Sequence, residues 1–231
     1  MSDDGPAGSI QLVCLDMAGT TVSDNGLVEQ AFEAALDEMG IEPADPSRSR
    51  MVAFIRDTMG MSKIEVFRSL FGDEARAQSA NAAFEQAFGD LIGTGVVRPI
   101  PGAVETIGLL RSSGMRVALT TGFSALTRIR LLEALGWEAV ADLALSPEDA
   151  GRGRPNPDMI LAAVVRLEAD SVRAVAVAGD TEEDMASGVR SGASVVAGVL
   201  TGTGDRAGLL SAGATSVLES VVELAGLLGL G

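Results

Sequence analysis

Short apolar runs alternate along the chain with segments of helical periodicity. The apolar runs, which predict strands, cover Gln11–Asp16, Arg116–Thr121, Asp142–Leu145, Ala174–Asp180, Ser194–Leu200 and Ser216–Leu218. The helical patterns cover Ala103–Ser112, Ala125–Ala134, Pro157–Leu167, Glu182–Ser191, Arg206–Ser211 and Ser220–Leu228. Continuous apolar strands that alternate with helices predict an α/β fold, with a doubly wound parallel sheet that is covered on both faces.

One region breaks this alternation. Between Leu27 and Val96, helical periodicity recurs without a strand, near Val28–Met39, Arg48–Thr58, Ser62–Leu70 and Asp73–Ile92. Glycines and prolines at 93–95 and 99–102 mark the return of the chain to the sheet. We therefore expect an all-helical cap domain over residues 25–96 and a core domain over residues 1–24 and 97–231. The apolar helix near Val28 either packs within the cap or forms a dimer seam, which leaves monomer and homodimer open.

Composition excludes several classes of function. The 231 residues are 47% hydrophobic and carry a formal net charge of −15, which argues against nucleic acid and anionic membranes as partners. The chain has no His, so Ser-His-Asp and Cys-His nucleophilic sites and His-ligated zinc are excluded. No apolar run reaches the roughly 20 residues of a membrane span, and the acidic start lacks a signal peptide's charge pattern. We expect a cytoplasmic protein.

Two of the predicted strands end on an acid. Asp16 ends the first run and Asp180 ends a later one, with Asp184 one helical turn beyond it. Parallel strands bring their carboxyl ends to one edge of the sheet, where open α/β sheets place ligands. Two carboxylates about 4 Å apart repel by about 4 kcal/mol at an effective dielectric of about 20, so a cluster that stays ionised favours a cation. Oxygen ligands suit Mg²⁺. Strand-ending turns and helix caps explain one acid well, but not two converging strand ends.

Two further segments could contact an anion at this edge. Thr121 and Gly122 end a third predicted strand, where a hydroxyl and backbone N–H groups can bind a phosphoryl oxygen. Arg154, between Gly153 and Pro155, precedes a predicted helix and could supply positive charge. Taken alone, each segment is equally compatible with an ordinary turn or a solvated surface loop.

Together, in this order, these strand ends resemble the four motifs of the haloacid dehalogenase superfamily of phosphotransferases and hydrolases. The resemblance extends over about residues 10–225 and implies a Rossmannoid core with an inserted cap. It implies that Asp16 is the nucleophile and forms an aspartyl-phosphate. The Mg²⁺ ligands that it implies are Asp16, the Ala18 carbonyl, Asp180 and Asp184. The implied phosphoryl contacts are Ala18, Gly19, Thr20, Thr121, Gly122 and Arg154.

Within the superfamily, the chain resembles phosphonoacetaldehyde hydrolase (phosphonatase). Most phosphatases of the superfamily carry a second Asp two residues after the nucleophile, and that position is Ala18 here. The segment 56–64 resembles the phosphonatase cap segment whose Lys forms a Schiff base with the aldehyde, so that the carbon–phosphorus bond can break. The resemblance implies that Lys63 is this Lys and that Met59 contacts the substrate. Lys63 is the single lysine in an Arg-dominated chain.

Three positions depart from the phosphonatase pattern. Met17 replaces a Trp, Val66 replaces a His and Phe123 replaces a Tyr. We expect a Mg²⁺-dependent hydrolase of phosphonoacetaldehyde or a related small phosphonate. The first alternative is a phosphatase of a small phosphate monoester, similar to phosphoglycolate phosphatase, in which Lys63 only binds substrate. The second is a phosphate-ligand binding protein without turnover.

Overall fold

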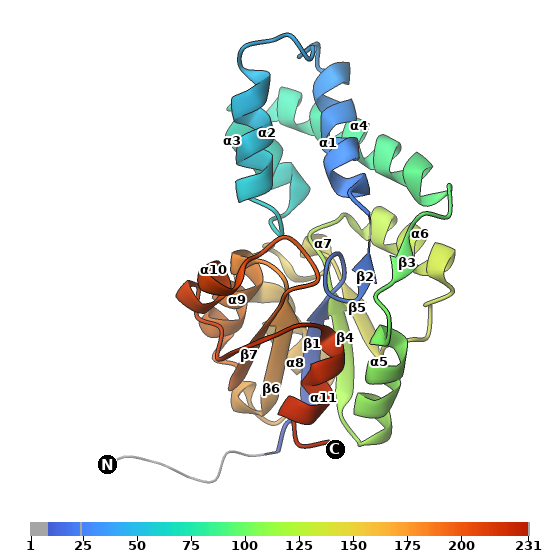
Figure 1. Cartoon of the computed structure of the whole chain (residues 1–231), viewed down its shortest axis with the longest axis vertical. Helices are drawn as coiled ribbons and strands as arrows, with labels where there is room; N and C mark the ends of the chain where they lie inside the picture. The colour runs from blue at the N-terminus through green and yellow to red at the C-terminus, as the bar shows by residue number, and fades with distance from the viewer. Residues whose placement is uncertain (1–8, 24, 231) are drawn as a thin grey trace.

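A six-stranded parallel sheet forms the lower part of the molecule in Figure 1. The computed structural model describes residues 9–23 and 25–230. The strand order is β5-β4-β1-β6-β7-β8, and every pair is parallel. The strands are β1 Leu12–Asp16, β4 Arg116–Thr120, β5 Leu143–Leu145, β6 Val175–Gly179, β7 Val195–Val199 and β8 Ser216–Leu218. The central strands β1 and β6 are buried along their whole length, which explains their continuous apolar sequence.

Helices cover both faces of this sheet, as the alternation predicts. Val13 and Leu15 of β1 pack in one apolar cluster with residues of α5, whereas Leu12 and Cys14 pack in a second cluster with residues of α8. The α-helices that follow β3 are α5 Ala103–Ser112, α6 Ala125–Leu135, α7 Pro147–Ala150, α8 Asp158–Arg166, α9 Glu182–Ser191, α10 Arg206–Ser211 and α11 Leu224–Leu227. The predicted doubly wound α/β class is confirmed.

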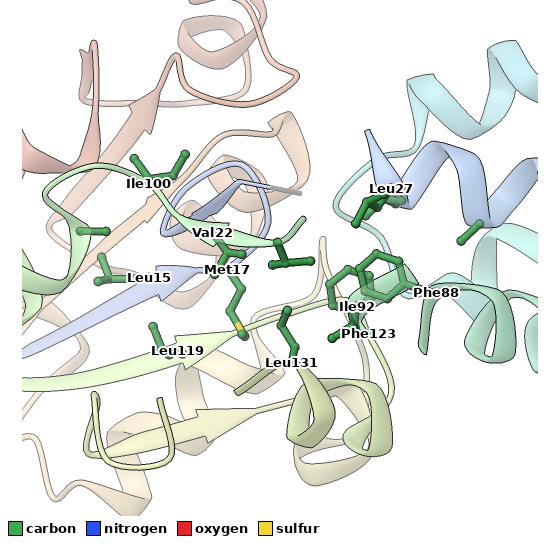
Figure 2. Packing of buried hydrophobic residues seen from close by; sticks show 14 of the residues in the cluster. Leu15, Met17, Val22, Leu27, Phe88, Ile92, Ile100, Leu119, Phe123 and Leu131 are labelled. Atoms are coloured by element: carbon green, nitrogen blue, oxygen red, sulfur yellow. The ribbon is translucent and has the colours of Figure 1, made fainter. Parts of the chain in front are cut away.

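Four helices stand over the carboxyl edge of the sheet (Figure 1). They are α1 Leu27–Glu38, α2 Arg48–Asp57, α3 Lys63–Phe71 and α4 Glu74–Ile92. Their shared core is aromatic: the ring of Phe32 lies 4.7 Å from that of Phe84 and 5.3 Å from that of Phe67. Phe123, from the turn after β4, stacks on Phe88 of α4 at 4.7 Å, and Figure 2 shows these two rings side by side. One residue of the sheet edge therefore belongs to the core of the helical segment.

The chain leaves the sheet and returns to it through a short two-stranded ribbon. Strand β2, Val22–Ser23, pairs antiparallel with β3, Arg98–Pro99. The division into a cap at 25–96 and a core at 1–24 and 97–231 stays a prediction. Residues 1–8 and 24 of the predicted core lie outside the described residues.

Local differences from the predicted elements have local causes. The predicted helix at Ser220–Leu228 is a 3₁₀ turn, Val221–Glu223, followed by the single turn α11, and the Ser220 side chain accepts a hydrogen bond from the Val222 N–H. The sequence analysis missed α7, although Asp149 in its first turn accepts a hydrogen bond from the N–H of the N-cap residue Ser146. Among the helices of the described residues, none has the length and apolarity that a bilayer span requires.

Candidate active site

Three carboxylates converge where β1 and β6 end. Asp16 is the last residue of β1, Asp180 directly follows the neighbouring β6, and Asp184 lies in the first turn of α9. One oxygen of each lies within 4.8 Å of the others, and the three residues are only 2–5% exposed. Parallel pairing of β1 with β6 thus brings the two acid-tipped strands together, as the sequence predicts. These carboxylates could hold a metal ion.

Arg154 is the cation that faces this cluster. Its Nη1 lies 2.6 Å from Oδ1 of Asp16, and its Nε lies 2.8 Å from Oδ1 of Asp184. Its Nη2 donates to the hydroxyl of Thr120 at 2.7 Å. Arg154 is 5% exposed, so this guanidinium is buried with its partners rather than solvated. One buried positive charge therefore faces three carboxylates.

The pKa shifts reflect this imbalance. Burial raises the pKa of Asp16 well above its usual range; the Arg154 guanidinium opposes this, and the carboxylates of Asp184 and Asp180 reinforce it. Burial and the neighbouring Asp184 raise the pKa of Asp180 to about 6, against hydrogen bonds from Thr203 and Thr20. An all-oxygen donor set with excess negative charge fits a hard divalent cation, which would favour the ionised carboxylates.

Neighbouring loops fix the orientation of Asp180 and Asp184. The hydroxyl of Thr20 donates to Oδ1 of Asp180 at 3.2 Å, and the Thr203 N–H donates to its Oδ2 at 2.9 Å. Asp184 Oδ2 accepts from the Thr181 N–H in the capping box that starts α9. Asp184 therefore has two roles. One carboxylate oxygen caps the start of α9, and the other orients the guanidinium of Arg154.

A cavity of about 300 Å³ lies between this edge and the helices above it. Most of the predicted site residues line it: Asp16, Ala18, Gly19, Met59, Lys63, Thr121, Gly122, Arg154 and Asp180. Thr20 and Asp184 are not among the lining residues. Thr20 is completely buried and directs its hydroxyl to Asp180, so the structure places it behind the cavity wall. Thr121 is 2% exposed, and its hydroxyl accepts from the Phe123 N–H at 3.2 Å.

Lys63 reaches this cavity from the helical segment. It is the first residue of α3, it is 6% exposed, and it is the single lysine of the chain. Its Nζ lies 5.2 Å from the centre of the Phe123 ring and 5.7 Å from that of Phe32. The Nζ also donates to the Met61 carbonyl at 3.5 Å. The structure therefore places this amine against aromatic faces in the cavity that Asp16 and Arg154 line.

Glycines let the segment before α3 close on the sheet edge. The Lys63 N–H donates to the Gly122 carbonyl at 3.3 Å, and a Cβ on Gly122 would lie 2.5 Å from the Met61 carbonyl oxygen. A Cβ on Gly60, where φ is +90°, would lie 2.4 Å from the Thr181 hydroxyl. Backbone therefore meets backbone here, and no side chain fits between Gly122 and Met61.

Sequence reasoning missed several residues of the cavity. Ser23, Asn25 and Glu29 line it from the chain around β2 and α1, and the loop after β7 contributes Thr201, Gly202 and Thr203. A signal for that loop was available, because it follows a predicted parallel strand and so lies at the same edge as Asp16. The alternation of Thr and Gly there was not singled out.

Comparisons with known proteins agree with this geometry. The family model described as haloacid dehalogenase-like hydrolase matches residues 10–192. A relative from Dickeya dadantii, named "Probable phosphatase IndB", is 28% identical over 221 residues, covering 93% of this chain and 92% of the relative. A phosphonoacetaldehyde hydrolase from Parabacteroides distasonis is 27% identical over 251 residues, covering 92% of this chain and 93% of that protein. The crystal structure of a hydrolase from Pseudomonas syringae is similar with a TM-score of 0.82 and 26% identity, covering 95% of this chain and 98% of that one.

Proposed function

The chain belongs to the family of haloacid dehalogenase-like hydrolases, and on this premise we propose that it is a Mg²⁺-dependent hydrolase that cleaves the carbon–phosphorus bond of phosphonoacetaldehyde or a related small phosphonate. The observation that carries the proposal is the position of Lys63, the single lysine, in the cavity that Asp16 and Arg154 line. Relatives named phosphonoacetaldehyde hydrolase support the same assignment.

In this proposal, Asp16 attacks phosphorus and Arg154 neutralises the phosphoryl oxygens. Thr121 and Gly122, at the end of β4, contact the same group. Asp16, the Ala18 carbonyl and Asp180 hold Mg²⁺, with Asp184 beside them. When bound, Mg²⁺ offsets the excess negative charge of the carboxylates and of the phosphoryl group. Residues 25–96 act as the cap, which opens to admit substrate and closes to exclude water.

Lys63 supplies the electron sink for carbon–phosphorus cleavage. Its neutral amine adds to the aldehyde carbon and releases water, which leaves a protonated imine. Asp16 then attacks phosphorus, and the electron pair of the carbon–phosphorus bond moves into the imine to give an enamine. Water hydrolyses the aspartyl-phosphate to phosphate and Asp16. Protonation of the enamine and hydrolysis of the imine release acetaldehyde and the free amine of Lys63.

Ala18 is consistent with this leaving group. A phosphate monoester releases an alkoxide, which benefits from a positioned acid. The methyl side chain of Ala18 cannot donate a proton. An enamine is a neutral leaving group, so carbon–phosphorus cleavage tolerates the missing acid better than ester hydrolysis does.

The cavity size restricts the substrate. At about 300 Å³, it lies at the small end of ligand sites and fits a metabolite of few heavy atoms. Val28, Met59 and Phe123 add apolar surface beside the polar edge. A two-carbon phosphonate matches this volume.

A specific observation favours a second candidate, a phosphatase of small phosphate monoesters. The faces of Phe32 and Phe123 lie near Nζ of Lys63, and aromatic faces attract an ammonium rather than a neutral amine. The His and Tyr of the phosphonatase pattern are Val66 and Phe123 here. In this candidate, Lys63 stays charged and binds an anionic part of the substrate. The relative named a probable phosphatase points the same way.

Reductive trapping distinguishes the two candidates. Phosphonoacetaldehyde and borohydride are added to the native protein, and tryptic peptides are analysed by mass spectrometry. Trypsin cleaves poorly after an alkylated lysine, so cleavage after Arg56 and Arg68 places a modified Lys63 in the peptide 57–68. We expect a reduced two-carbon adduct on that peptide, together with phosphate release that is lost in Lys63→Met.

Lys63→Arg serves as the control, because it keeps the positive charge at this position but cannot form the imine there. The variant still has the N-terminal amine of the chain, so any adduct formed at that amine appears in the control as well. Phosphate release from a panel of phosphate monoesters at near-native rate by Lys63→Met, without any adduct on the native protein, would establish the phosphatase instead. Asp16→Asn is expected to abolish turnover under either candidate.

A further inference from the structure

The loop after β7 encloses the carboxylate of Asp180. It consists of Thr201, Gly202, Thr203 and Gly204, and we refer to it as the TGTG loop. The Thr203 N–H donates to Oδ2 of Asp180, and the Gly204 N–H donates to its backbone carbonyl, both at 2.9 Å. The TGTG loop therefore holds both the side chain and the main chain of Asp180.

Glycine makes this close approach feasible. A Cβ on Gly202 would lie 1.9 Å from Oδ2 of Asp180, and a Cβ on Gly204 would lie 2.2 Å from the Asp180 carbonyl oxygen. Neither glycine has a positive φ, so space rather than backbone conformation requires glycine here. From the opposite side, a Cβ on Gly19 would lie 2.5 Å from the same carboxylate oxygen. Asp180 is thus held between the turn after β1 and the TGTG loop.

Thr201 joins these two loops directly. Its hydroxyl donates to the Gly19 carbonyl at 2.6 Å, across 182 positions of sequence. The Gly19 N–H donates to the Val22 carbonyl at 2.8 Å. Both peptide groups that flank Gly19 are therefore anchored. The first of them contains the Ala18 carbonyl, whose direction is fixed by the anchored N–H because the peptide group is planar.

We propose that Thr201 is a positioning residue that, through Gly19, holds the Ala18 carbonyl and the Asp180 carboxylate in the arrangement that binds a divalent cation. This inference rests on the proposed function, since it assumes that these groups are cation ligands. Thr201 itself does not contact substrate in this role. Its hydroxyl fixes the turn that carries Ala18 by donating to the Gly19 carbonyl.

Cation affinity tests the proposal without an activity assay. Mn²⁺ serves as the probe, and its binding to the native protein and to variants is measured by electron paramagnetic resonance and calorimetry. Thr201→Val keeps the shape of the side chain and removes the hydroxyl, and we expect it to weaken Mn²⁺ binding about tenfold. Thr201→Ser keeps the hydroxyl, and we expect it to restore binding to within about twofold of native, which a loss of packing would not predict.

Thr215→Val is the matched control. The Thr215 hydroxyl also donates to a backbone carbonyl, that of Val196 in β7, at 3.0 Å, and it lies outside the cavity. We expect this variant to bind Mn²⁺ like the native protein. Equal affinities for Thr201→Val and Thr215→Val would overturn the role of Thr201 alone. Should Thr201→Val fail to fold, a Thr201→Ala variant with native affinity would overturn it equally. Absence of Mn²⁺ and Mg²⁺ binding by the native protein would overturn the proposed function and this inference with it.

Discussion

The guanidinium of Arg154 lies 2.6 Å from the carboxylate of Asp16, and both side chains are almost completely buried. Asp16 ends β1, and Arg154 comes from the loop before α8, at the same edge of the sheet. Arg154 also contacts Asp184, so its removal would leave a cluster of buried carboxylates without their positive partner. This relationship makes one side chain, Arg154, balance the negative charge of two carboxylates at this edge.

The first prediction concerns this buried pair. Arg154→Met is expected to lower the free energy of unfolding of the metal-free protein by about 3–5 kcal/mol, because it leaves buried carboxylates without their positively charged partner. Arg152→Met is the control two residues away, since Arg152 pairs with Asp158 while 68% of its own side chain is exposed. We expect that control to cost less than about 1 kcal/mol. Urea unfolding measures both, and equal losses would contradict the argument.

The second prediction concerns pH. The pKa of Asp180 is raised to about 6, and burial also raises the pKa values of Asp16 and Glu183. A carboxyl group with a raised pKa binds its proton more tightly in the folded state than in the unfolded state. Its contribution to stability is therefore fully present below the unfolded pKa, near 4, and is lost as the pH rises through about 6. No His is present to titrate in this range.

The metal-free protein should therefore melt at a higher temperature near pH 5 than near pH 7.5. Excess Mg²⁺ should raise the melting temperature near pH 7.5 and have little effect near pH 5, where protons compete for the same carboxylates. Differential scanning calorimetry with and without a chelator measures this. A melting temperature that rises from pH 5 to pH 7.5 in the metal-free protein would refute the prediction.

The sequence predicts the carboxylate edge because that edge follows from periodicity and topology alone. Apolar runs that end in Asp16 and Asp180 must be parallel strands, and parallel strands end at the same edge. The helical segment between the first two sheet strands follows from its periodicity in the same way. The approach of Asp16 to Asp180 needs nothing more than this pairing, whereas the position of Arg154 was expected only from the resemblance to the haloacid dehalogenase superfamily.

Long-range packing accounts for what the sequence did not predict. Thr20 was expected at the phosphoryl group, but only the folded turn shows that its hydroxyl is directed at Asp180. Phe123 reads as a substitution in a phosphate-binding turn, yet its ring stacks in the aromatic core of the helices. The role of Thr201 depends on a contact across 182 positions, which no local pattern encodes.

The third prediction concerns the contact between the helical segment and the carboxyl edge of the sheet. Gly122→Ala places a methyl group 2.5 Å from the carbonyl oxygen of Met61. Because this oxygen belongs to the backbone, we expect the residues before α3 to move away from the carboxyl edge of the sheet. The free energy of unfolding should fall by about 1–3 kcal/mol, and KM for the substrate should rise. Gly108→Ala in α5 is the control, since no atom of the described part of the chain lies within 4 Å of the added Cβ. It should be neutral or stabilising by up to about 1 kcal/mol. Native KM in Gly122→Ala would contradict this account.

The fourth prediction concerns Glu85 of α4, which ties the helical segment to α6. Its Oε2 accepts from the hydroxyls of Ser124 and Thr127, and its buried Oε1 has no hydrogen-bond partner among residues 9–23 and 25–230. Glu85→Ala would leave the two hydroxyls without their acceptor, and we expect a loss of about 1–3 kcal/mol in the free energy of unfolding, with faster proteolysis between α4 and α6. Glu85→Gln should lose less, because its amide oxygen still accepts. Gln86→Ala on the same helix removes only bonds to exposed Asp90 and should unfold like the native protein. If Glu85→Ala and Gln86→Ala unfold alike in urea, these hydrogen bonds do not stabilise the contact between the helical segment and α6.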